Sequence, residues 1–219
     1  MRRAGRPIPS DPDTPAARLR AASGVQRVPS PTLELFIARG FLDEAACVRL
    51  VGLIDAGRRP STIADDRGQD AYFRTSETCD LDSADPAVGD VDRRIAELLG
   101  LPLAASEPIQ GQRYAPGQEF KPHTDTFEPN GADFFTHCAA TGNRTWTAMI
   151  YLNEPEAGGA TRFKAIDKTI QPELGKLLAW NNLLPDGRPN PATLHQGMKV
   201  RKGAKYILTK WFREHPFPA

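Results

Sequence analysis

The chain has few cysteines and no excess of charge of either sign. Its 219 residues include three cysteines, Cys47, Cys79 and Cys138. This odd number, without a CxxC spacing, argues against a disulfide framework or a cysteine zinc site. Lysine and arginine together number 28, and aspartate and glutamate 27, so the electrostatic signature of a nucleic-acid or anionic-membrane partner is missing. We expect neither partner, and a reducing cytoplasm is the simplest location.

Long apolar runs are also absent. No stretch approaches the roughly 20 apolar residues that span a bilayer, and no apolar segment follows the N-terminal arginines, so this end does not resemble a secretory signal. The first 30 residues lack hydrophobic periodicity, and we interpret 1–30 as a flexible arm. The remaining length, 31–219, suits one compact domain. We expect the protein to act as a monomer or a homodimer.

The first half of that domain contains two helices with recognisable ends. A short strand is expected from Leu33, in LELFIARGF, and Asp43 then caps a helix that should stop near Gly57. A second helix begins at Asp85, which a proline follows, and keeps apolar residues at helical spacing as far as Gly100.

The second half changes to short β segments broken by glycine, proline and asparagine. Two helices ahead of such a run indicate helices packed on one face of a β-sandwich or jelly roll. The fold class is therefore α+β, mainly β. The expected strands cover 108–115, 145–152, 160–164, 175–181 and 204–213.

An imidazole and a carboxylate, His123 and Asp125, stand two residues apart. On an extended backbone such residues project from the same face, so both could contact one metal ion. Only four histidines are present, and His195 lies among the later strands, whereas His137 and His215 have no carboxylate at a useful spacing. Two histidines and one carboxylate form the ligand set of non-haem Fe(II) oxygenases. An HxD pair is common by chance, and a zinc site remains compatible with these ligands.

A lysine accompanies a tryptophan on the strand that follows His195. Alternation places Lys205, Ile207, Thr209 and Trp211 on one face. Burying that lysine is costly unless an anion meets it, and the distal carboxylate of 2-oxoglutarate would be such an anion. The alternative is that Lys205 lies on the outer face and is solvated.

Three sequence blocks resemble the prolyl 4-hydroxylase family of Fe(II)- and 2-oxoglutarate-dependent oxygenases. They are QRYAPGQEFKPHTD at 112–125, YLNEPEAGGATRF at 151–163 and LHQGMKVRKGAKYILTKWFRE at 194–214. Weaker matches are FRTSET at 73–78 and RRIAELLGLP at 93–102. The resemblance implies a double-stranded β-helix, a cupin-like jelly roll, with N-terminal helices packed on one sheet.

The resemblance also implies roles for particular residues. His123, Asp125 and His195 match the family's Fe(II) ligands, and Lys205 and Tyr114 match residues that hold the distal carboxylate of the cosubstrate 2-oxoglutarate. O2 is the second cosubstrate, and ascorbate is a conceivable accessory reductant.

Four further positions match the family more weakly. Thr161 and Trp211 correspond to residues that line the cosubstrate pocket and the iron site, although a strand residue beside a hairpin and a core tryptophan would look the same. Arg144 corresponds to a substrate-contacting arginine, although a surface arginine at a strand start is commonplace. Phe120 stands where the family often has tyrosine, which removes one polar contact near a peptidyl proline.

The resemblance favours prolyl 4-hydroxylation of a peptide or protein, with release of succinate and CO2. The same chemistry on a small molecule or another residue type is the first alternative, and Phe120 favours it. A non-catalytic cupin-like module and a zinc hydrolase are further alternatives. The segments 127–143 and 58–78 are candidate lids or substrate-contacting loops, and both could equally be surface insertions.

Overall fold

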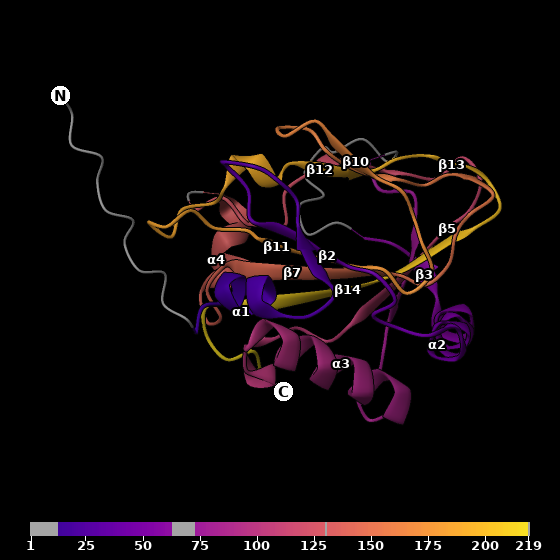
Figure 1. Ribbon diagram of the computed structural model, residues 1–219, viewed down its shortest axis with the longest axis horizontal. Coiled ribbons are helices and arrows are strands. Elements are labelled where there is room, and N and C mark those ends of the chain that lie inside the picture. Colours follow the sequence, from indigo (N-terminus) through magenta and orange to yellow (C-terminus); the bar gives the residue numbers. More distant parts are fainter. Residues whose placement is uncertain (1–12, 63–72, 130, 219) are drawn as a thin grey trace.

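The computed structural model describes residues 13–62, 73–129 and 131–218, and these form two facing β-sheets with helices against one of them (Figure 1). In Figure 1 the minor sheet lies above the major sheet, and helix α3 lies below the major sheet. All strand pairs are antiparallel. The arrangement is a jelly roll, the fold that the sequence predicted.

The major sheet has eight strands within the described residues. In spatial order these are β1 (Val25–Arg27), β2 (Leu35–Ala38), β11 (Leu177–Asn181), β7 (Arg144–Tyr151), β14 (Lys205–Arg213), β5 (Gln110–Tyr114), β4 (Glu77–Asp80) and β3 (Arg59–Pro60).

In the part of the chain that the structure describes, the minor sheet has four strands, and two further strands form a separate pair. Its spatial order is β10 (Lys168–Ile170), β9 (Thr161–Phe163), β12 (His195–Gly197) and β6 (Phe120–His123). The separate pair is β13 (Val200–Lys202) with β8 (Ala157–Gly158). Short 3-10 turns at Leu103–Ala105 and Pro191–Thr193 complete the connections.

Two helices have the ends that the sequence predicted. The helix α2 (Glu44–Gly57) begins after Asp43, whose carboxylate accepts from the Ala46 amide. The helix α3 (Pro86–Leu99) begins after Asp85 and ends at Gly100, which adopts the left-handed conformation with φ 68° that favours glycine.

The apolar core lies on both faces of the major sheet. One cluster joins the helices to the outer face, and a second fills the space between the two sheets. Alternation along β14 sends Leu208 and Phe212 to the helix side and Ile207 to the inner side. Lys205 and Trp211 therefore belong to the inner, pocket-lining face of β14.

The prediction that a flexible arm extends to residue 30 is wrong, because the last part of this segment is folded. The segment contains α1 (Pro15–Ala21) and β1, and Ala16 and Leu19 are buried in the helix-side cluster. Residues 1–12 lie outside the described residues.

The segment 127–143 contains a short helix, α4 (Ala132–Cys138), where a loop was expected. Hydrogen bonds hold its two ends together. Asn143 joins the two ends, because its Oδ1 accepts from the Phe127 amide at 3.0 Å and its Nδ2 donates to the Phe127 carbonyl at 2.7 Å. In the other candidate lid, 58–78, β3 and β4 pair, and 63–72 lie outside the described residues. None of the helices in the described ranges has the length and apolar character needed to cross a membrane.

Candidate metal centre and cosubstrate pocket

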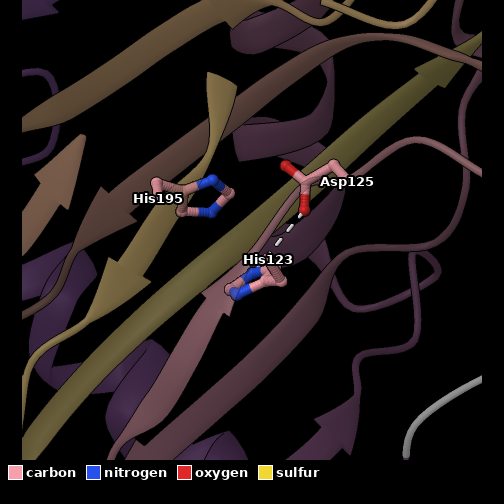
Figure 2. Close-up of side chains that lie close together, drawn as sticks. All are labelled: His123, Asp125 and His195. Carbon is pink, nitrogen blue, oxygen red and sulfur yellow. Dashed lines mark ion pairs between the residues drawn. The ribbon is translucent and has the colours of Figure 1, made fainter. Parts of the chain in front are cut away.

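Strand register brings the three predicted ligands together. His123 ends β6, His195 begins β12, and the two residues are direct partners in the antiparallel pair. Asp125 follows two residues after His123, and one donor atom from each of the three side chains lies within 4.8 Å of the others. Figure 2 shows the two imidazole rings and the carboxylate converging on a common space. His137 and His215 do not belong to this cluster.

Backbone carbonyls orient both imidazole rings. The Nδ1 of His123 lies 2.8 Å from the Lys121 carbonyl oxygen, and the Nδ1 of His195 lies 2.9 Å from that of Thr193. Since a carbonyl only accepts, each Nδ1 donates its proton and leaves the Nε2 lone pair for a metal. Burial lowers the pKa of His123 to about 3, so this ring is neutral at pH 7, the form that binds metal.

A hydrogen-bonded relay fixes the carboxylate ligand. The Thr147 hydroxyl donates to Asp125 Oδ2 at 2.7 Å, and it accepts from Asn182 Nδ2 at 2.8 Å. Burial alone would raise the pKa of Asp125, but the neighbouring histidines, Arg144 and the Thr147 hydroxyl together hold it below its usual value. The carboxyl group is therefore ionised and able to bind a cation.

The donor set fits a divalent transition metal with open coordination positions. Two imidazole nitrogens and one carboxylate oxygen are the ligands of non-haem Fe(II) oxygenases, which leave positions open for substrates. Two buried indole Nε1 atoms, those of Trp180 and Trp211, have no acceptor among the described residues, and both side chains line the same pocket. A bound group with acceptor atoms would satisfy them.

The pocket also contains a buried cation. Lys205 is 1% exposed and forms no ion pair with any residue in the described ranges. Its Nζ lies 4.7 Å from the ring centroid of Tyr114 and 5.7 Å from that of Tyr151. Burial lowers the pKa of Lys205 from 10.5 to about 7. The solvated alternative for this residue is wrong, and the ammonium lacks the anion that would stabilise it.

Tyr114 lies directly opposite Lys205 in the pairing of β5 with β14. Its hydroxyl donates to Gln112 Oε1 at 2.6 Å, and Gln112 Nε2 donates in turn to the Thr209 hydroxyl at 3.2 Å. Burial raises the pKa of Tyr114, so the phenol stays protonated and remains a donor. It would have to turn from Gln112 to donate to a ligand beside Lys205.

Thr161 and Trp211 line the pocket as the resemblance implied. The Tyr151 hydroxyl donates to Thr161 Oγ1 at 2.6 Å, so a second buried tyrosine, which the sequence did not single out, orients this threonine. Phe120 forms another wall, with its ring stacked on His123 at a centroid distance of 3.5 Å.

Arg144 lies beside the metal ligands without lining the pocket itself. Its Nε and Nη2 contact the Glu107 carboxylate at 2.6 and 2.7 Å, and its guanidinium carbon lies 3.9 Å from the ring centroid of Trp211. Arg213 shares the same carboxylate at 2.6 Å. Burial alone would raise the pKa of Glu107, but the two guanidinium groups hold it below its usual value.

The pocket lining includes residues beyond the predicted set, among them Met149 and Arg74. Met149 could have been found from the alternation of β7. Arg74 belongs to the FRTSET block, whose weak resemblance was the only available signal.

Comparison with known proteins agrees with this site. The 2OG-Fe(II) oxygenase superfamily model matches residues 109–213, which include the three metal-binding candidates, Tyr114 and Lys205. Prolyl 4-hydroxylase subunit alpha-1 of Gallus gallus is 32% identical over 145 residues, which cover 66% of this chain and 28% of the relative. Subunit alpha-2 of Caenorhabditis elegans is 34% identical over 145 residues, covering 66% of this chain and 27% of the relative. The chain thus spans little more than a quarter of the length of these relatives.

Solved structures show the same fold. The viral collagen prolyl hydroxylase of Paramecium bursaria Chlorella virus-1, in complex with 2-oxoglutarate, superposes with a TM-score of 0.65 and 25% identity over 82% of this chain and 94% of that chain. A Trichoplax adhaerens prolyl hydroxylase bound to a hypoxia-inducible-factor peptide fragment is 14% identical, with a TM-score of 0.62 over 92% and 88% of the two chains. Residues 109–213 thus match the 2OG-Fe(II) oxygenase superfamily, and the chain is similar in sequence and fold to prolyl 4-hydroxylases.

Proposed function

We propose that this protein is an Fe(II)- and 2-oxoglutarate-dependent dioxygenase that hydroxylates a proline in a peptide or protein at C4. The observation that carries the proposal is the buried ammonium of Lys205, which has no carboxylate partner among the described residues and shares one pocket with His123, Asp125 and His195. A 2-oxoglutarate molecule would supply an anion to the lysine and chelating oxygens to the metal.

The residues of the chain position the reactants. His123, Asp125 and His195 would hold Fe(II), and Lys205 with Tyr114 would hold the distal carboxylate of 2-oxoglutarate. When bound, the iron and the keto acid supply the redox chemistry, by which O2, 2-oxoglutarate and a C–H bond give succinate, CO2 and a hydroxylated product. The remaining task of the protein is to orient the substrate and exclude water from the reacting atoms.

The apolar walls favour a substrate with a compact apolar ring. Phe120 and Trp211 both line the pocket that contains the metal ligands, and a proline ring can pack against such aromatic faces. The family relationship supports a peptide substrate. Phe120, which lacks the hydroxyl often found at this position, is the feature that favours a small molecule or a different residue type as the alternative.

A zinc hydrolase explains the pocket less well. Zinc would accept the same three ligands, but hydrolysis needs no buried lysine at the far end of the pocket. A non-catalytic module would not need to keep both the ligands and Lys205 in place.

The test combines product analysis with ligand substitutions. Purified protein with Fe(II), 2-oxoglutarate and proline-containing peptides should release succinate and add one oxygen atom to a proline, as seen by fragmentation mass spectrometry. His123→Ala and Asp125→Ala should abolish both products. Full activity of either variant would contradict the ligand assignment, and oxygen added only to other residues or to a small molecule would contradict the prolyl substrate.

A further inference from the structure

A second cationic side chain, Arg74, reaches the same pocket as the metal ligands and Lys205. Its guanidinium group is held by neutral acceptors. Nε donates to the Ser76 hydroxyl at 3.2 Å, Nη1 to the Thr62 carbonyl at 3.3 Å, and Nη2 to the Thr78 hydroxyl at 3.0 Å and to Gln110 Oε1 at 2.8 Å.

Arg74 forms no ion pair with a carboxylate in the described ranges, unlike the other arginines close to the pocket. Arg144 and Arg213 share the Glu107 carboxylate, and Arg113 contacts that of Glu77 at 2.6 Å. Arginine remains charged in proteins, so Arg74 brings to the pocket wall a positive charge that no carboxylate in the described ranges pairs with.

Strand register places Arg74 far from Lys205. Arg74 bonds to Gln110, which is paired with Thr209, whereas Lys205 lies four residues earlier on β14, roughly 13 Å along the strand. Trp211, at the other end of this face, is paired with Thr147, the hydroxyl of which holds Asp125. Arg74 thus lies on the β4–β5 side of the pocket, where its guanidinium group interacts electrostatically with Tyr114 and, more weakly, with Asp125.

Phe120 links Arg74 to the metal centre. The guanidinium carbon of Arg74 lies 5.0 Å from the centroid of the Phe120 ring, and the same ring stacks on His123. A substrate group that reaches the metal ligands beside Phe120 therefore comes close to Arg74.

The charges of the loaded site leave Arg74 unmatched. Fe(II) and Lys205 together carry three positive charges, and Asp125 with the two carboxylates of 2-oxoglutarate carries three negative charges. The positive charge of Arg74 is additional. On the basis of the proposed function, we infer that the peptide substrate carries a carboxylate close to the target proline and that Arg74 pairs with it.

The chemistry of Arg74 suits this role. A guanidinium group has five N–H donors, and the four hydrogen bonds to neutral acceptors leave one Nη1–H unused. A carboxylate adds charge attraction and a bidentate geometry that neutral oxygens cannot offer to a guanidinium group, so it would compete well with the hydroxyl and carbonyl acceptors. It could come from the C-terminus of the peptide or from an acidic side chain.

Calorimetry on the full chain loaded with Mn(II) and 2-oxoglutarate tests this inference without turnover. The three ligands are N-acetyl-Ala-Pro with a free carboxylate, the same dipeptide as its amide, and N-acetyl-Ala-Pro-Asp amide. We expect at least one acidic peptide to bind about 10- to 100-fold more tightly than the neutral amide. An advantage of the free dipeptide identifies the chain terminus as the source of the carboxylate, and an advantage of the Asp peptide identifies an acidic side chain.

Two variants assign the effect to Arg74. In Arg74→Gln the advantage of the acidic peptide should fall to within about twofold of the amide, with the affinity for 2-oxoglutarate unchanged. Arg59→Gln is the matched control, because Arg59 pairs with exposed Asp80 and does not line the pocket. It should keep the full advantage.

Equal affinities of the acidic and neutral peptides for the unmodified protein would overturn the inference, whatever the variants do. So would an advantage retained in Arg74→Gln, or a tenfold loss of 2-oxoglutarate affinity in that variant, which would assign Arg74 to the cosubstrate. A failure of the proposed function alone would give a different result. The acidic peptides would still bind in an Arg74-dependent way, but the Fe(II)-loaded protein would form neither succinate nor hydroxyproline.

Discussion

Lys205 and Tyr114 face each other across β14 and β5, with the lysine Nζ 4.7 Å from the centroid of the tyrosine ring. The ring face stabilises the ammonium weakly, and the described residues provide no carboxylate for it. A buried lysine in this state lowers stability until an anionic ligand binds. The pair therefore marks the end of the pocket where 2-oxoglutarate is expected to place its distal carboxylate.

Replacing Lys205 with methionine should weaken cosubstrate binding without lowering the stability of the fold. Lys205→Met keeps the length of the side chain and removes a buried charge, so the melting temperature should stay the same or rise. The affinity for 2-oxoglutarate, measured by calorimetry with Mn(II), should fall about 10- to 100-fold.

Lys210→Met is the matched control on the opposite face of β14. Lys210 pairs with buried Asp92 at 2.7 Å, so its removal should destabilise the fold and leave the 2-oxoglutarate affinity unchanged. Equal 2-oxoglutarate affinities for Lys205→Met and the unmodified protein would contradict the role assigned to Lys205.

Lys205 also predicts a pH dependence of stability. Burial lowers its pKa from 10.5 to about 7 in the folded chain, so between these values the unfolded chain binds more protons. The free energy of unfolding without ligand should therefore rise with pH through this window, with a slope of at most about 1.4 kcal/mol per pH unit from this group. Urea unfolding at several pH values, compared with Lys205→Met, isolates the effect. The same slope in both proteins would show that Lys205 is not the group responsible.

Thr147→Val should weaken metal binding without removing a ligand. The variant removes the hydroxyl that donates to Asp125 Oδ2 and accepts from Asn182, so the carboxylate loses its orientation. We expect the affinity for Mn(II) to fall about 10- to 100-fold. Thr145 lies on the same strand as Thr147, and Thr145→Val removes a bond to the Phe212 carbonyl of β14, so this variant should leave metal affinity unchanged. Similar metal affinities for the two variants would rule out the relay.

Glu107→Gln should destabilise the fold, because buried Arg213 and half-buried Arg144 would lose their shared carboxylate. Arg144 and Arg213 contact Glu107 at 2.6 Å each, and breaking such a buried network costs about 3–5 kcal/mol. Chemical denaturation measures the loss. Asp167→Asn breaks an exposed pair with Arg162 and should have little effect. A Glu107→Gln variant as stable as this control would contradict the structural role of the Arg144–Glu107–Arg213 network.

The metal centre and the pocket face were predictable because they depend on local alternation. His123 ends β6 and Asp125 lies in the bend two residues later, so their spacing was enough to suggest a ligand pair, and Lys205 and Trp211 share a face of one strand. The ends of α3 were predictable for a similar reason, since the cap at Asp85 and the left-handed turn at Gly100 are local.

The parts that were missed depend on contacts between distant segments. The helix α1 has seven residues, too few for a clear helical period, and Ala16 and Leu19 are buried through packing in the helix-side cluster. Arg74 reaches the pocket through bonds that include Gln110, 36 residues away, and such a contact leaves no local pattern. The helix α4 has no side-chain cap at its start, so the usual signal of a helix N-terminus was absent.

The most direct test of the central claim is the coupling of succinate release to hydroxyproline formation. Protein loaded with Fe(II) should convert 2-oxoglutarate and a proline-containing peptide to succinate and hydroxyproline in near-equal amounts, with the new oxygen derived from 18O2. Lys205→Met should need about 10- to 100-fold more 2-oxoglutarate for the same rate. No 2-oxoglutarate-dependent succinate, or activity that does not require His123, Asp125 and His195, would contradict the assignment of this pocket as an iron and 2-oxoglutarate site.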